Sequence, residues 1–166
     1  MKIHDDHLYH GAALLQIAEH PEFTAINPLE LGERNLRVAY KVNDNIAIYL
    51  KYATRPTGRY KEYVFTFSAA QLADIYNVRM LLSSIFIALV CVADREVCCL
   101  SEAELRSMVM ARESEIGDEE DSVTVLVSIQ QGKSLRAYVN VPGQRKGEAL
   151  EVHVVPRGAF PAKLFA

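Results

Sequence analysis

The chain has 166 residues, of which 50% are hydrophobic and 23% are charged, and its formal net charge is −3. This length and composition are typical of a globular protein with a core of its own. The negative charge disfavours a protein that coats nucleic acid or anionic membrane through bulk electrostatics, while a local basic patch stays compatible with it. We therefore expect one globular domain over residues 1–166.

Neither a membrane span nor a secretory signal is visible in the sequence. The most apolar run, residues 80–92, is interrupted by Ser83 and Ser84, and a membrane helix needs about 20 apolar residues. The N-terminal segment lacks the apolar stretch of a signal peptide. The three cysteines are odd in number and have no CxxC spacing, which favours reduced thiols. We expect a cytoplasmic protein that does not interact with membranes.

The N-terminal segment predicts a helix followed by less regular structure. Asp5 or Asp6 can cap a helix that runs through a series of apolar residues and ends by Pro21. Residues 23–26 indicate a short strand. Residues 28–35 contain a proline and a glycine and are typical of a loop.

Residues 36–68 carry the clearest structural signals. Two β-rich runs meet at residues 43–45, an Asn-Asp-Asn turn whose residues tolerate positive φ. After a Pro- and Gly-containing loop, Tyr63, Phe65 and Phe67 alternate with smaller residues. This period of two predicts a strand with one aromatic face.

Two capping boxes predict where the next helices begin. Ser68 precedes Gln71 by three residues, and Ser101 precedes Glu104 by the same spacing. In such a pair the serine accepts from the third helical amide and the later side chain reaches back to the serine amide. Between these helices, residues 85–91 and 96–100 predict a hairpin. If its loop is only residues 94–95, Cys91 lies opposite Cys98, and such a buried pair favours inert core over redox chemistry.

The C-terminal third predicts hairpins after an acidic connector. The acidic run at residues 113–121 contains Gly117 and indicates an exposed connector, the one place where the domain could divide into lobes. The expected strands and turns that follow are residues 123–129, residues 135–139, a turn at residues 143–147 and a last strand at residues 150–155. The tail carries two phenylalanines, so we expect it to pack against the core.

These elements amount to about three helices and seven to nine short strands, mostly joined as hairpins. This pattern favours an α+β fold with an antiparallel or mixed β-sheet over a wound βαβ fold.

The order of the elements around the turn at residues 43–45 resembles the core of the PD-(D/E)xK nuclease-like superfamily. A helix with Glu19 precedes strands that meet at Asp44, and the next strand carries Lys51. The resemblance implies Mg²⁺ or another divalent metal held by the two acids, with Lys51 helping to activate water for phosphodiester hydrolysis. The sequence departs from the family because Tyr49, rather than an acid, stands two residues before Lys51. The alternative is that Asp44 only forms the turn and Lys51 lies on a solvated strand face.

The N-terminal histidines form a second candidate site. His4, His7 and His10 recur at a spacing of three and are interleaved with Asp5 and Asp6. This spacing places them within one arc of a helix, and imidazole with carboxylate suits Zn²⁺ or a similar metal. The alternative is an exposed helix end.

A basic loop forms the third candidate site, and its residues are Arg55, Arg59, Tyr60 and Lys61. Cations with an aromatic ring can hold phosphates and stack a base, which predicts nucleic-acid contact. Arg145 and Lys146, in a later turn, would extend the patch if they fold nearby. The alternative is an ordinary solvated loop.

The sequence lacks a Walker loop, G-x-G-x-x-G, G-x-S-x-G and H-E-x-x-H. Two hypotheses of different class therefore remain. One is a non-catalytic binding or accessory module for a macromolecular partner, including self-association through an exposed strand edge. The other is a nuclease-like domain with metal-dependent phosphodiester hydrolysis. The first is favoured because the acid two residues before Lys51 is missing and the net charge is negative. The sequence establishes no cofactor.

Overall fold

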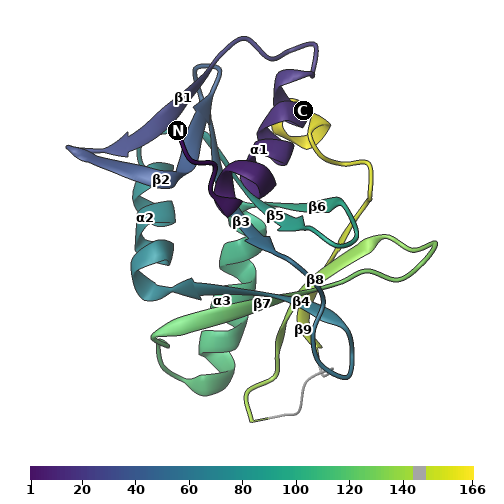
Figure 1. The fold of residues 1–166 in the computed structure, drawn as a ribbon. Helices are drawn as coiled ribbons and strands as arrows, with labels where there is room; N and C mark the ends of the chain where they lie inside the picture. The colour runs from purple at the N-terminus through teal and green to yellow at the C-terminus, as the bar shows by residue number, and fades with distance from the viewer. Residues whose placement is uncertain (144–148) are drawn as a thin grey trace.

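The computed structural model describes residues 1–143 and 149–166, and Figure 1 shows its helices lying on two β-sheets. The helices in these ranges are α1 (Asp5–Ala18), α2 (Ala69–Arg79), α3 (Glu102–Ile116) and the short 3₁₀ helix η1 (Ala162–Phe165). The first sheet has the order β1 (Ile26–Leu31), β2 (Arg34–Val42), β3 (Ile46–Ala53), β5 (Ser84–Cys91), β6 (Glu96–Ser101). The second sheet has the order β4 (Glu62–Ser68), β7 (Ser122–Ser128), β8 (Leu135–Asn140), β9 (Ala149–Val155). None of these helices is long and apolar enough to cross a membrane.

The two sheets are interleaved along the chain. β3 and β5 are parallel neighbours in the first sheet, yet the segment that joins them contributes β4 to the second sheet. Every other strand pair is antiparallel in the part of the chain that the structure describes. The predicted α+β class with hairpin-built strands is confirmed, and the strands form one mixed and one antiparallel sheet rather than a single sheet.

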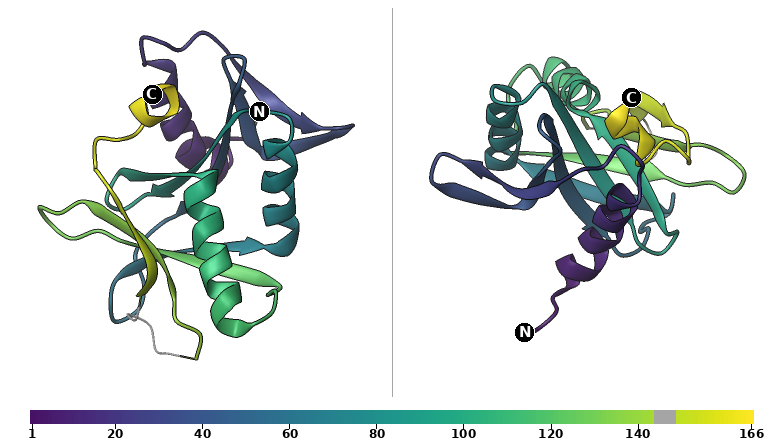
Figure 2. Two further views of the ribbon diagram at one scale, coloured as in Figure 1. Left: turned by 180° about the vertical axis from the view of Figure 1, so that it is seen from behind. Right: turned by 90° about the horizontal axis from the view of Figure 1, so that it is seen from above.

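The helices cover different faces of the first sheet. α1 lies on one face, and α2 and α3 lie side by side on the opposite face (Figure 2). The larger core cluster includes three aromatic residues of β4, since Tyr63, Phe65 and Phe67 are 1%, 1% and 0% exposed. The aromatic face predicted for this strand is therefore confirmed. The smaller cluster lies under α1 and includes Phe160 and Leu164, so the C-terminal tail packs as expected.

Both capping boxes form as predicted. Ser68 Oγ accepts from the Gln71 amide at 3.1 Å, and Gln71 Oε1 accepts from the Ser68 amide at 3.0 Å. Ser101 and Glu104 repeat the pattern at 3.1 Å and 3.0 Å. Each box lies where a strand passes directly into a helix, and its two bonds satisfy backbone amides at the start of that helix.

Several N-terminal predictions are wrong in detail. α1 is preceded by His4 as its N-cap, and Asp5 and Asp6 instead occupy its first turn. The predicted strand at residues 23–26 begins only at Ile26, and the predicted loop at residues 28–35 belongs to the β1–β2 hairpin. Proline is tolerated there because β1 is an edge strand and an edge leaves one row of amides unpaired.

Three further predictions need correction or lie outside the described residues. The loop of the β5–β6 hairpin is longer than two residues, so Cys91 lies opposite Glu96 and Cys98 opposite Leu89. The acidic run is not all connector, because α3 continues to Ile116 and ends at Gly117 with φ 84°. The turn at residues 143–147 falls mostly on residues 144–148, outside the described ranges.

A bend in β2 shapes the surface that faces α1. β1 pairs Pro28 with Tyr40 and the next residue, Leu29, with Leu36. Residues 37–39 of β2 are therefore skipped by β1, which makes a bulge several residues wide. Because such bulges bend a strand and turn its side chains, the first part of β2 follows β1 away from the sheet, and only the last part pairs with β3.

Candidate functional site

The structure does not bring the three predicted catalytic residues together. Asp44 is exposed in the β2–β3 turn, and Lys51 lies near the far end of β3, seven residues later. Because an extended strand rises about 3.3 Å per residue, their backbones are about 20 Å apart. Glu19 is the exposed C-cap of α1. The segment that follows it is bonded to Asn43, so Glu19 lies at the Asp44 end of the strand.

Lys51 is half-buried among neutral groups. Its Nζ lies 3.2 Å from Gln71 Oε1 and 4.8 Å from the centre of the Phe67 ring. No ion pair among the described residues includes this lysine. Burial lowers the pKa of Lys51. Burial, together with the charge of Asp74, raises the pKa of Tyr49, so the residue in place of the family's acid stays a neutral phenol.

The predicted histidine cluster is also divided. His4 donates its backbone N–H to His7 Nδ1 at 3.0 Å, which uses one imidazole nitrogen in the helix cap. His10 is only 7% exposed and packs edge-on against Tyr52, with ring centres 5.4 Å apart. Among the described residues, no three His, Cys, Asp or Glu side chains form a group that could hold a metal ion. The structure therefore does not assemble the three histidines as ligands.

His10 and Lys51 instead meet at an uncovered edge of β3. The pairing of β2 with β3 stops at Ala39 and Tyr49, so residues 51–53 have no strand neighbour on that side in the described chain. A pocket of about 190 Å³ lies at this edge, and we call it the β3-edge pocket. Its lining is His10, Val38, Tyr49, Leu50, Lys51, Tyr52 and Gln71. Side chains from both faces of β3 line it, as expected where a strand edge is open.

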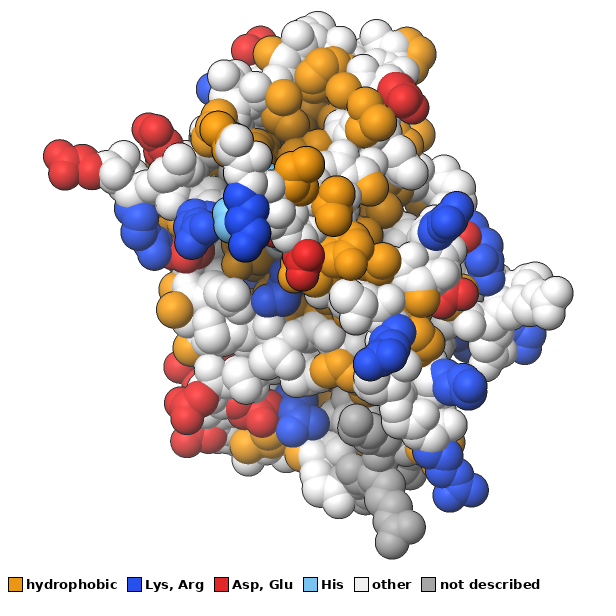
Figure 3. All heavy atoms as spheres, in the orientation of Figure 1, with side chains coloured by type: hydrophobic (Ala, Val, Ile, Leu, Met, Phe, Trp, Pro, Cys, Tyr) orange, Lys and Arg blue, Asp and Glu red, His pale blue; other side chains and the backbone are white. Residues whose placement is uncertain are grey.

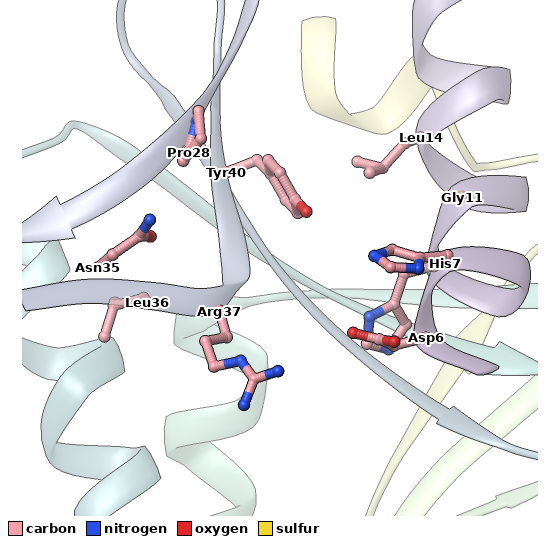
Figure 4. A pocket seen from close by; sticks show the side chains of 10 residues that line it. Asp6, His7, Gly11, Leu14, Pro28, Asn35, Leu36, Arg37 and Tyr40 are labelled. Atoms are coloured by element: carbon pink, nitrogen blue, oxygen red, sulfur yellow. The ribbon is translucent and has the colours of Figure 1, made fainter. Parts of the chain in front are cut away.

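A second pocket adjoins the first through His10. This α1–β2 cleft has a volume of about 320 Å³ and lies between the first turns of α1 and the bulge of β2. Figure 4 shows Asp6 and His7 on the helix side of the cleft and Arg37 and Tyr40 reaching toward them from β2. The bulge of β2 thus supplies Arg37 to this cleft and the next residue, Val38, to the β3-edge pocket.

The buried imidazole of His10 has an unmet hydrogen-bonding requirement. Its Nε2 is buried and has no hydrogen-bond partner among the described residues. Burial lowers the pKa of His10, with a smaller opposing influence from Asp6 and a further lowering by Lys51. An orphaned buried polar atom is rare in folded proteins.

The basic loop predicted to contact nucleic acid follows directly after the open edge. Arg55, Arg59, Tyr60 and Lys61 are all exposed in the β3–β4 connection. None of these cations takes part in an ion pair within the described ranges. In the view of Figure 3, basic side chains lie beside a histidine on one side of the molecule, and further basic side chains lie along the other side. Arg145 and Lys146 lie outside the described residues.

Sequence reasoning named His10 and Lys51 but assigned them to different sites. It missed Gln71 and Tyr52 as neighbours of Lys51 and Arg37 as part of the cleft. The signal for Gln71 was present, because its capping role fixes its position at the end of β4. Nothing in the local sequence marks residues 37–39 as a bulge, so the open edge could not be predicted.

Comparison with known proteins returned no match among family models, curated proteins or solved structures.

Proposed function

We propose that the open edge of β3 is a non-catalytic binding site, at which this protein acts as a binding module that receives an acidic segment of a protein partner. The observation that carries this proposal is the edge of β3 at residues 51–53, which has no strand neighbour on one side in the described chain and has Lys51 and His10 beside it. An exposed edge offers main-chain donors and acceptors to an added strand, and adjacent pockets then select its side chains.

The charges at this edge favour a carboxylate as the selected group. Lys51 has no acidic partner among the described residues, and Gln71 contacts it as a neutral acceptor. A half-buried cation without a counter-charge is disfavoured in the free protein because burial removes water without replacing it. An incoming carboxylate relieves this cost, and the exposed cations of the β3–β4 loop attract it from a distance.

The separation of Asp44 from Lys51 supports binding over cleavage at this site. Phosphodiester hydrolysis of the nuclease-like kind needs metal-bound carboxylates within reach of the lysine. The acids assigned to that role lie at the other end of β3. The competing hypothesis is a module that binds nucleic acid through the basic loop. It predicts that binding depends on Arg55 and Arg59 rather than on Lys51.

The test measures binding of two fluorescent probes by polarisation. One probe is a short peptide of alternating glutamate and valine, and the other is a single-stranded oligonucleotide of similar charge. Replacing Lys51 by Met should weaken peptide binding about tenfold, as expected for loss of one charge-assisted contact. Lys133→Met, which removes an exposed lysine from the β7–β8 turn, is the matched control and should bind as the wild type.

Two outcomes would overturn the proposal. Oligonucleotide binding that is stronger than peptide binding and depends on Arg55 and Arg59 rather than Lys51 would favour the nucleic-acid form. Cleavage of the oligonucleotide in Mg²⁺ or Mn²⁺ that disappears in Lys51→Ala would establish the nuclease alternative.

A further inference from the structure

A serine, a histidine and a glutamate lie close together where β9 packs on α3. Ser107 Oγ is 3.0 Å from His153 Nε2, and His153 Nδ1 is 3.6 Å from Glu104 Oε2. Ser107 and Glu104 are one turn apart on α3, and His153 comes from β9. The two ring nitrogens of the histidine therefore face a hydroxyl and a carboxylate.

The carboxylate of Glu104 is held in place by two other contacts. Its Oε1 accepts from the Ser101 amide at 3.0 Å and from Lys163 Nζ at 2.6 Å. Burial by itself raises the pKa of Glu104, but the bonds from Lys163 and Ser101 outweigh it and lower the pKa overall. Glu104 is thus an ionised carboxylate whose second oxygen, Oε2, is left to face the imidazole.

The position of this carboxylate selects the tautomer of His153. A carboxylate beside Nδ1 favours the proton on that nitrogen, which leaves Nε2 as an acceptor toward Ser107. The single hydrogen of the Ser107 hydroxyl has two possible acceptors. It points to the Glu104 carbonyl at 2.8 Å in one orientation, and rotation of the hydroxyl turns it to Nε2 at 3.0 Å. The second acid near the ring, Glu151, is 3.9 Å from Nε2 and 46% exposed, so it lies farther from the ring than Glu104 and is more screened by water.

From this geometry we infer that Ser107, His153 and Glu104 form a nucleophile, general base and positioning carboxylate able to hydrolyse small carboxylic esters. The inference does not depend on the proposed binding role of the β3 edge. Ser107 Oγ attacks the ester carbonyl while its proton passes to His153 Nε2. The bond to the alcohol then breaks, and His153 returns the proton to the departing oxygen. Water repeats the sequence on the acyl-serine, which releases the acid and restores Ser107.

The surroundings favour a substrate with a short apolar acyl chain. The His153 side chain is 22% exposed, so the site opens to solvent. Met110, 59% exposed, lies three residues beyond Ser107 on α3, a spacing that makes them neighbours on the helix surface. An acyl chain of a few carbons bound to Ser107 can therefore contact Met110.

The first experiment asks which residue reacts. The full chain is treated with a fluorescent fluorophosphonate, and the modified peptide is identified by mass spectrometry. The expected adduct is on Ser107, and it should disappear in Ser107→Ala and weaken in His153→Gln. Circular dichroism and melting curves of each variant show that loss of labelling is not loss of folding.

The second experiment measures p-nitrophenyl butyrate hydrolysis. Ser107→Ala should lower the rate about 100-fold, the low end of what a positioned base contributes. Glu104→Gln, which keeps a side-chain acceptor for the cap, should lower kcat and leave KM unchanged, because Glu104 positions the base and does not contact the substrate. Glu151→Gln is the matched control, and it should leave the rate unchanged.

Unmodified Ser107 in the presence of the fluorophosphonate, or unchanged hydrolysis in folded Ser107→Ala, would overturn the inference. Equal effects of Glu104→Gln and Glu151→Gln would overturn the positioning role of Glu104.

Discussion

The turn between β2 and β3 depends on one side chain, and its removal makes a quantitative test of the fold. Asn43 Oδ1 accepts from the Thr24 amide at 2.7 Å and from Thr24 Oγ1 at 2.9 Å, while Nδ2 donates to the Glu22 carbonyl at 2.9 Å. Asn43 also has φ 53°, in the left-handed region. Oδ1 accepts a further bond from the Ala25 amide at 3.3 Å, so Asn43→Ala removes four bonds and strains the backbone.

The expected magnitudes follow from these contacts. Bonds at a partly hydrated site are at the low end of the usual range, so their loss costs about 2 kcal/mol in total. The left-handed conformation adds about 1 kcal/mol for alanine and little for glycine. We expect Asn43→Ala to lower the free energy of unfolding by about 3 kcal/mol, Asn43→Gly by about 2, and Asn43→Asp, which keeps the acceptor, by about 1.

Urea unfolding of the three variants, compared at equal m values, measures this order. Equal stability of the alanine and glycine variants would refute the role of φ. A loss below about 0.5 kcal/mol in Asn43→Ala, the usual range for neutral surface changes, would refute the role of the bonds.

Three other predictions concern the core and its titratable groups. Burial lowers the pKa of His10 below its unfolded value of 6.5. The unfolded state therefore binds more protons, and the free energy of unfolding falls as the pH drops through 6.5. In urea titrations at different pH, His10→Gln should make this fall smaller. Burial raises the pKa of Cys98 and Cys99 to about 12, so Ellman's reagent should react with them only after denaturation. Phe65→Ala should cost about 3–5 kcal/mol of unfolding free energy in the same urea assay, since the ring is 1% exposed in the larger core cluster.

The parts of the fold that the sequence predicted are those specified by neighbouring residues. The capping boxes at Ser68 and Ser101, the Asn43 turn and the alternation of Tyr63, Phe65 and Phe67 all act within a few residues, and all are confirmed. The division into two sheets depends on contacts between distant segments. No local pattern shows that β4 leaves its neighbours to pair with β7.

The N-terminal helix shows how a polar residue can hide a buried face. α1 buries His10, Ala13 and Ile17 and exposes Leu8 and Leu15. The buried residues also follow a helical spacing, but a histidine among them makes that side of the helix look exposed when only the sequence is considered. For the same reason His10 was assigned to a histidine cluster on the helix and Lys51 to a different site, so one site that contains both residues was not predicted.

The interleaved order of the two sheets has a consequence for how the chain can be divided. Each sheet takes strands from both before and after α2, and core residues from both sides of the acidic run at residues 113–121 belong to one cluster. A cut in the exposed connector after Gly117 would leave an N-terminal fragment whose β4 has lost β7, the one strand that pairs with it in the described part of the chain. Neither fragment should fold alone, but mixing them should restore the native circular dichroism spectrum, since the missing strands come only from the other piece. The connector is therefore a suitable place to divide the chain into two fragments that fold only when both are present.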